Sequence, residues 1–243
     1  IAVNVEHLID QGMYCFLISS GAIMMGKSGK NGQDYEERDN LKLDITELQY
    51  YAGLGQYKLI AEYDRAFSRQ VMQMLFTAKK KDNGLDSDVA KLSIDELELV
   101  RKENRCRIMK HCMMNGGVVV GNYDDPTHDM EARHDNDTTT ALVTAAYNSM
   151  NEQKITRAVF LGTEDGIYRD IENRRGLIQK VNNIERFHEC CRSARESDNN
   201  GLGGASKKIY AARYLAERGV EAHIANIDRL RGCEDGLKKI VNN

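Results

Sequence analysis

The chain has little of what several large classes of protein require. It contains no tryptophan and a single proline, Pro126, and its apolar runs, such as Val118 to Val120, are far too short to span a bilayer. A basic region followed by an apolar stretch, the pattern of a secretory signal, is not found in its first residues. The formal net charge is −3 and the isoelectric point about 6.1, which favours neither nucleic acid nor a membrane as partner. We expect a cytoplasmic protein with small-molecule partners.

The usual motifs of three kinds of enzyme are also missing. The six cysteines form no C-x-x-C pair, and Cys190 adjoins Cys191, so we interpret them as reduced thiols. The histidines have no zinc-ligand spacing with these cysteines, and there is no G-x-S-x-G elbow of a serine hydrolase. No G-x-G-x-x-G follows an early strand, which disfavours a dinucleotide-binding dehydrogenase, and there is no Walker A loop.

What the chain does contain is an alternation of strand-like and helix-like segments. Its 243 residues, 41% hydrophobic and 29% charged, have the composition of an ordinary globular protein. Short apolar runs predict strands, and apolar residues at helical spacing predict helices. The predicted strands are 13–19, 71–76, 118–121, 158–162 and 220–225, and the predicted helices are 1–11, 46–67, 88–114, 137–150, 177–192 and 204–218. This order predicts an α/β fold, a mainly parallel sheet covered on both faces, in one domain.

Small residues directly follow two of the predicted strands. Ser19, Ser20 and Gly21 come after the first strand, and Gly162 and Thr163 end the fourth. Open α/β sheets bind ligands beyond the carboxyl ends of their strands, so both places are candidate ligand loops. Each sequence is equally typical of an ordinary tight turn.

Five aspartates crowd into the fourteen residues from 124 to 137: Asp124, Asp125, Asp129, Asp135 and Asp137. Helix capping accounts for one residue at the start of the helix predicted from 137. The mutual repulsion of the others is relieved by a divalent ion or by the ammonium group of an amino acid. A solvated acidic loop is the alternative interpretation.

A glycine cluster, Gly201, Gly203 and Gly204, precedes the last long predicted helix. It is followed by Ala205, Ser206, Lys207 and Lys208. Glycines allow the backbone to approach a ligand closely, and the first turn of a helix favours phosphate oxygens. We therefore regard this segment as a candidate phosphate-binding loop; a flexible loop before a surface helix is the alternative.

Taken together and in this order, these segments resemble the glutamate 5-kinases of the amino acid kinase superfamily over nearly the whole chain. The matching stretches are LISSGAIMMG (17–26), LQYYAGLGQYKLI (48–60), GNYDD (121–125), HDNDTTTALVTAAYN (134–148), DGIY (165–168) and GLGGASKKIYAARYLAERGVEAHIAN (201–226). The combination is far more specific than any one part.

The resemblance implies a three-layer αβα sandwich with a mainly parallel sheet, which uses ATP and Mg²⁺ to phosphorylate glutamate in the first step of proline synthesis. By motif position, the residues that hold glutamate are Ser20, Asp125 and Asn136. Those that bind the nucleotide are Gly162, Thr163, Leu202, Gly203, Gly204, Ala205, Ser206, Lys207 and Lys208. Of these, Lys208 matches the lysine that contacts the transferring phosphate, and we predict it to be catalytic.

The chain also departs from the family pattern. Thr163 replaces an aspartate of the nucleotide loop, and Ala205 and Lys207 replace the methionine and threonine of the glycine loop. We expect residues 1–243 to form one amino acid kinase domain without the family's first strand, which carries a Lys-x-Gly-Ser motif, and without the C-terminal RNA-binding-like domain of some members. Two alternatives stay open: a catalytically impaired, nucleotide-binding relative with a regulatory role, and a kinase for another small carboxylate or phosphate acceptor. Self-association into a homo-oligomer is compatible with the resemblance.

Overall fold

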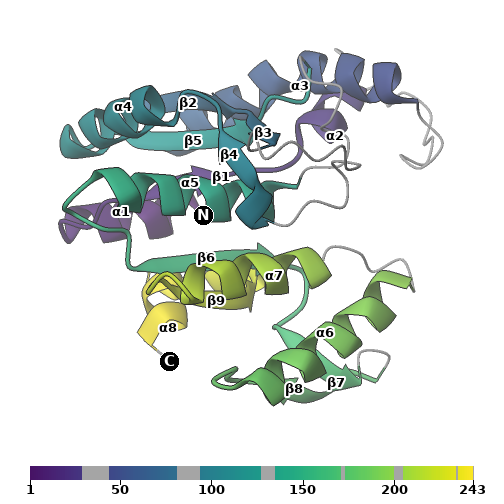
Figure 1. Ribbon diagram of the computed structural model, residues 1–243. Helices are drawn as coiled ribbons and strands as arrows, with labels where there is room; N and C mark the ends of the chain where they lie inside the picture. The colour runs from purple at the N-terminus through teal and green to yellow at the C-terminus, as the bar shows by residue number, and fades with distance from the viewer. Residues whose placement is uncertain are drawn as a thin grey trace.

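The computed structural model describes residues 1–28, 44–80, 94–126, 135–170, 173–199, 205–233 and 235–242. Helices and strands alternate along the chain (Figure 1). The first half contains α1 (Ala2–Asp10), β1 (Phe16–Ile18), α2 (Ala22–Lys27), α3 (Ile45–Ala66), β2 (Val71–Phe76), β3 (Ala78–Lys80), η3 (Ile94–Glu96), β4 (Leu97–Leu99), α4 (Lys102–Met114) and β5 (Val118–Tyr123). The second half contains α5 (Asn136–Met150), β6 (Arg157–Gly162), β7 (Ile167–Asp170), β8 (Arg175–Ile178), α6 (Ile184–Asn199), α7 (Ala205–Ala216), β9 (Glu221–Asn226), η4 (Ile227–Leu230) and α8 (Gly236–Asn242).

Two parallel sheets form the centre of the molecule. Strands β1, β5 and β2 make one sheet in the order β1-β5-β2, and β6 pairs with β9 in the other. The register places Ile18 opposite Gly121 and Phe76 opposite Tyr123, so the three strands of the first sheet end at the same edge. The hairpins β3–β4 and β7–β8 are antiparallel additions.

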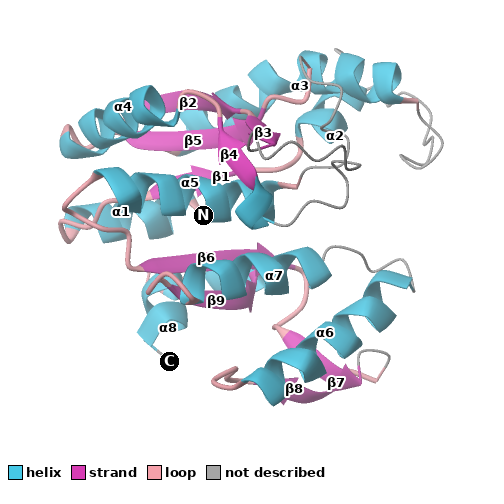
Figure 2. Ribbon diagram, viewed as in Figure 1, coloured by secondary structure: helices cyan, strands magenta, loops and turns pink. Residues whose placement is uncertain are grey.

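Helices cover both faces of these sheets (Figure 2). Successive residues of β5 point to opposite faces, as the pleat of a strand requires. Val119 packs with the apolar residues of α4 and α5, whereas Val118 and Val120 pack with those of α1, α3 and α8. In β6, Phe160 packs against α5 and α7, and Leu161 faces the α1–α3–α8 side. The result is the predicted three-layer αβα sandwich with mainly parallel strands.

Helix α2 lies unusually close to α3 because a glycine stands at each point of contact. A Cβ atom added at Gly55 would lie 1.7 Å from the backbone oxygen of Ala22. One added at Gly26 would lie 1.8 Å from the backbone oxygen of Tyr51. This contact fixes the start of α2, and with it the small-residue turn that follows β1.

Most of the predicted elements are confirmed, but two predicted helices are too long. The helix predicted over 88–114 is wrong at its start, because Leu97 and Leu99 are buried on one side of β4, which pairs with β3, and α4 begins only at Lys102. The helix predicted over 177–192 begins at Ile184, after the hairpin β7–β8. Within the described parts of the chain, no helix combines the length and the apolar character that crossing a membrane demands.

Candidate functional site

The turn after β1 presents the first predicted ligand-binding residue. Ser19 continues the sheet, because its backbone N–H donates to the carbonyl of Gly121 (2.9 Å), and its hydroxyl is hydrogen-bonded to that of Tyr63 (2.8 Å). Gly21 has φ of +115°, a conformation that side chains other than glycine rarely adopt. The chain therefore turns sharply into α2 and leaves Ser20 exposed at the carboxyl edge of the sheet.

The start of α5 brings Asn136 to the same turn. Asp135 is the N-cap of α5, which begins one residue earlier than predicted, and its Oδ1 accepts from the N–H of Thr138 (2.6 Å). The Asn136 amide Nδ2 donates to the hydroxyl of Ser20 (2.9 Å) and to the carbonyl of Ser19 (3.2 Å). The structure thus joins two predicted substrate-binding residues that lie 116 positions apart.

The Asn136 amide has a fixed orientation and an unsatisfied oxygen. The carbonyl of Ser19 can only accept a hydrogen bond, so the atom facing it must be the donating Nδ2. The amide oxygen Oδ1 is buried, and no partner for it exists among the described residues. A buried acceptor without a donor is costly, and an N–H group of a ligand would satisfy it.

Asp125 lies just beyond β5, at the edge where β1 also ends. Burial, reinforced by the neighbouring carboxylate of Asp124, raises the pKa of Asp125 to about 6. Among the described residues, no hydrogen bond joins Asp125 to Ser20 or Asn136. A positive charge placed beside Asp125 would offset the cost of its ionisation.

Replacing Asp125 with asparagine should change how stability depends on pH. The folded state holds the Asp125 proton more tightly than the unfolded state, so between about pH 4 and pH 6 folding binds protons, and wild-type stability falls as the pH rises. The Asp125→Asn variant lacks this loss, and its free energy of unfolding relative to wild type should rise by on the order of 2 kcal/mol between pH 4 and pH 7. Urea unfolding at pH 4 and pH 7 measures this difference. A difference that does not change with pH would show that Asp125 titrates normally.

The first turn of α7 supplies the predicted catalytic residue. The Lys208 ammonium Nζ lies 2.8 Å from Oδ2 of Asp137, and both side chains are largely shielded from solvent. Burial raises the pKa of Asp137, and the charge of Lys208 opposes that rise. A Cβ atom added at Gly162 would lie 3.5 Å from Cε of Lys208, so the lysine stem passes beside the end of β6. Two predicted nucleotide-binding residues, Gly162 and Lys208, are therefore neighbours.

The remaining predicted nucleotide-binding residues are distributed around this point. Ala205, Ser206 and Lys207 open α7, and Lys207 pairs with Asp135 (3.1 Å). The carbonyl of Thr163 accepts from the side chain of Asn226 at the end of β9 (2.9 Å). Leu202, Gly203 and Gly204 lie outside the described residues.

Three contributions to this site escaped the sequence reasoning. Asp137 was visible in the acidic cluster, but nothing in the sequence showed that it faces Lys208. Asn226 and Gln56 lie within the matching stretches 201–226 and 48–60, but no role was predicted for either. The buried side chain of Gln56 accepts from Asn122 (2.9 Å) at the end of β5. Each depends on a contact between distant segments.

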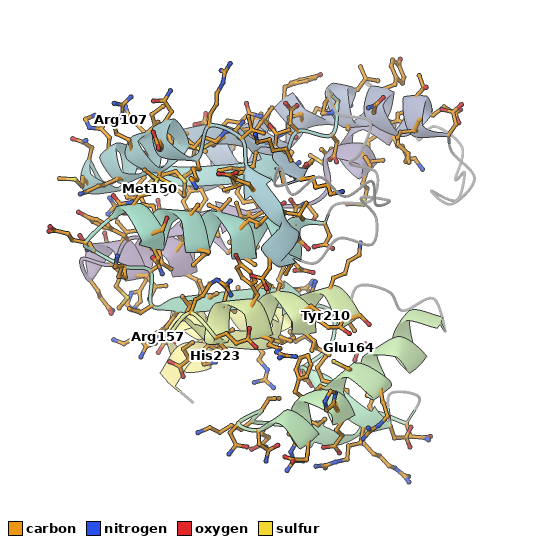
Figure 3. The ribbon with its side chains drawn as sticks, viewed as in Figure 1. Arg107, Met150, Arg157, Glu164, Tyr210 and His223 are labelled. Carbon is orange, nitrogen blue, oxygen red and sulfur yellow. The ribbon has the colours of Figure 1, made fainter. Side chains whose placement is uncertain are left out.

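The acidic residues after β6 form ion pairs with arginines and not with the lysines of α7. Glu164, labelled in Figure 3, pairs with Arg174 in the β7–β8 turn (2.8 Å), and Asp165 pairs with Arg229 (3.4 Å). Neither carboxylate therefore neutralises Lys208. Over the described ranges, no group of three or more histidine, cysteine, aspartate or glutamate side chains is arranged to hold a metal ion.

The site thus combines two helix N-termini with the carboxyl ends of parallel strands. In Figure 1, α5 and α7 lie side by side with their N-terminal ends on the same side, where β1, β5 and β6 also end. Helix N-termini favour anions, and Lys208 adds a full positive charge. On the β1 side, Ser20, Asn136 and Asp125 offer hydrogen-bonding groups and a carboxylate. Groups suited to an anion and groups suited to a small polar molecule therefore lie close together.

Comparison with known proteins shows the family of the chain. The model of the amino acid kinase family matches residues 1–226. The chain therefore belongs to the amino acid kinase family.

Proteins named glutamate 5-kinase are similar to the chain at low identity. That of Prochlorococcus marinus (strain AS9601) is 25% identical over 226 residues, which cover 90% of this chain and 55% of that protein. That of Xanthomonas axonopodis pv. citri (strain 306) is 27% identical over 247 residues, covering 96% and 61%. That of Bifidobacterium animalis subsp. lactis (strain AD011) is 29% identical over 212 residues, covering 85% and 49%. The chain spans about half the length of the curated relatives it matches.

Proposed function

We propose that the protein transfers the γ-phosphoryl group of ATP to the side-chain carboxylate of L-glutamate, the first step of proline biosynthesis. The observation that carries the proposal is the buried, unpartnered oxygen of Asn136, which is held beside Ser20 and adjoins Asp137, the partner of Lys208. A hydrogen-bond donor, such as the ammonium group of an amino acid, would satisfy this oxygen. The family match and the glutamate 5-kinases similar to the chain support the same reaction.

The residues present fit the phosphates of a nucleotide. The positive end of the α7 helix dipole favours anions, and the lysines of its first turn add positive charge. The stem of Lys208 passes beside Gly162, within ordinary van der Waals distance of a Cβ atom added there, so the lysine lies at the end of β6. Mg²⁺ would accompany the nucleotide and neutralise part of the charge on its phosphates.

The proposed reaction requires positioning and charge neutralisation rather than a general base. The side-chain carboxylate of glutamate is ionised at neutral pH, so it is already a nucleophile. The difficulty is to bring it against an anionic phosphoryl group, because phosphoryl transfer is accelerated mainly by alignment and electrostatics. Ser20, Asn136 and Asp125 orient the acceptor through its ammonium group, and Lys208 stabilises the negative charge on the transferring phosphoryl group.

The test is ADP release by the full-length protein with ATP and Mg²⁺, using glutamate, aspartate, N-acetylglutamate and UMP as acceptors. We expect turnover with glutamate and little with the others. Turnover with another acceptor would show that the protein is a kinase whose substrate is not glutamate. Nucleotide binding without turnover on any acceptor would instead favour the regulatory, nucleotide-binding relative.

An Asn136→Leu variant tests the acceptor site within this reaction. Leucine has a similar size but offers neither the donor to Ser20 nor the acceptor Oδ1. The KM for glutamate should rise by roughly tenfold or more, while the KM for ATP changes little, since a lost hydrogen bond to a charged group is worth about 1.5–3 kcal/mol. Equal increases in both KM values would mean that Asn136 supports the site as a whole and does not contact the acceptor.

A further inference from the structure

The first turn of α7 carries an unusual arrangement of charge. It contains two adjacent lysines, Lys207 and Lys208, and no acidic residue. The helix dipole disfavours positive charge at this end of a helix. Two aspartates at the start of α5 offset this: Asp135 pairs with Lys207 (3.1 Å), and Asp137 pairs with Lys208 (2.8 Å). The four charges therefore form one cluster between the two helix N-termini.

The two ion pairs lie at different depths. The Lys208 and Asp137 side chains are 22% and 17% exposed, whereas Lys207 is 52% exposed and its partner Asp135 22%. An ion pair as open as that of Lys207 contributes little to stability, about 0–1 kcal/mol. Lys207 is also free to change partner at little cost, because its ammonium group is already in contact with water.

Asp135 serves two purposes with its two oxygen atoms. Oδ1 caps α5 through the N–H of Thr138, and Oδ2 holds Lys207. The cap does not depend on Lys207, so the lysine can leave without unwinding the helix. The next residue is Asn136, whose unpartnered oxygen marks the acceptor side of the site. Lys207 is thus paired with Asp135, the residue before Asn136 on the acceptor side of the site. Lys207 itself lies in the first turn of α7, on the nucleotide side.

We propose that Lys207 couples the binding of the two substrates, an inference that rests on the function proposed above. When a nucleotide binds at the start of α7, its phosphates draw the ammonium group of Lys207 away from Asp135. The carboxylate of Asp135 then lacks a cation, and the ammonium group of the acceptor amino acid replaces it. Nucleotide and acceptor therefore favour each other's binding, although they contact different sides of the cluster.

The coupling is measured by calorimetric titration of glutamate into the full-length protein, with and without a non-hydrolysable ATP analogue and Mg²⁺. The wild-type affinity for glutamate should rise about five- to tenfold when the analogue is present. By thermodynamic reciprocity, glutamate should raise the affinity for the analogue by the same factor. Both measurements involve binding alone and need no turnover.

Two variants should shift the affinities in opposite directions. Lys207→Met frees Asp135 permanently, so glutamate should bind more tightly without nucleotide, the analogue should bind more weakly, and the coupling should disappear. Asp135→Asn keeps an N-cap residue but releases Lys207. In that variant the analogue should bind more tightly, glutamate more weakly, and the coupling should again disappear. Lys207→Arg keeps the charge and should retain the coupling.

If the pair of Lys207 and Asp135 is purely structural, both variants should bind both ligands with lower affinity. That pattern, or coupling that persists in Lys207→Met, would overturn the inference. If the wild type binds both ligands independently, the inference fails and the proposed function stands. If the wild type binds no nucleotide at all, both fail together.

Discussion

Replacing Lys208 with methionine should lower kcat by on the order of a thousandfold, the usual effect of removing a group that stabilises transition-state charge. The lysine ammonium lies at the junction of α7, the end of β6 and the start of α5. Methionine preserves most of the stem beside Gly162 but removes the charge that, in the proposed reaction, stabilises the transferring phosphoryl group. Single-turnover kinetics with saturating ATP and glutamate would measure the chemical step separately from binding.

The same substitution also leaves a carboxylate without its partner, so stability must be measured alongside activity. Asp137 is largely shielded from solvent, and burial already raises its pKa. Lys208→Met should therefore reduce the free energy of unfolding by roughly 1–3 kcal/mol. Adding Asp137→Asn removes the unpaired charge and should restore stability without restoring activity. A double variant that regains both, or a single variant whose kcat falls less than tenfold, would show that Lys208 has no direct part in transfer.

The sandwich fold could be predicted from the sequence because its central signals are local. The run Val118 to Val120 is apolar on both sides of the pleat, which is possible only for a strand covered on both faces, and β5 is such a strand. The first long helix is likewise predicted almost to its ends, over 46–67 against Ile45–Ala66, because its apolar residues recur at helical spacing.

The elements that were missed depend on partners elsewhere in the chain. Leu97 and Leu99 have the charged neighbours of a helix surface, yet they form β4 because β3 offers a strand to pair with. The candidate site likewise depends on contacts between distant segments. Its turns and its N-cap are local features, but the pairing of Asp137 with Lys208 joins residues 71 positions apart, and no spacing reveals it.

Two glycines in α3 lower its helix propensity, but only one of them is required for packing. Gly53 and Gly55 both lie inside the helix predicted over 46–67, where glycine is a poor helix former. In the structure, Gly55 is buried against the backbone of α2, whereas Gly53 is exposed, and a Cβ atom added there would lie 3.8 Å from the ring of Pro126. One glycine therefore positions α2, and the other only lowers helix propensity.

Gly55→Ala should consequently be strongly destabilising, and Gly53→Ala should not. The added methyl group at position 55 would lie 1.7 Å from the carbonyl oxygen of Ala22, a backbone atom that can move only if α2 moves. We expect the free energy of unfolding to fall by roughly 3 kcal/mol. In the matched control, Gly53→Ala, stability should be unchanged or rise by up to about 1 kcal/mol, because alanine is the better helix former. Urea unfolding of both variants measures the contrast.

The displacement of α2 should also reach the acceptor site. Ser20 and Gly21 lead directly into α2, so a shift of that helix changes the distance between Ser20 and Asn136, which is bridged by a hydrogen bond of 2.9 Å. For folded Gly55→Ala protein, the KM for glutamate should rise by on the order of tenfold, because small misplacements of a positioning group are costly. Lys208 and Gly162 lie on other elements, so the KM for ATP should change much less. If Gly55→Ala and Gly53→Ala proved equally stable and equally active, the close contact between α2 and α3 would have no part in holding Ser20 in place.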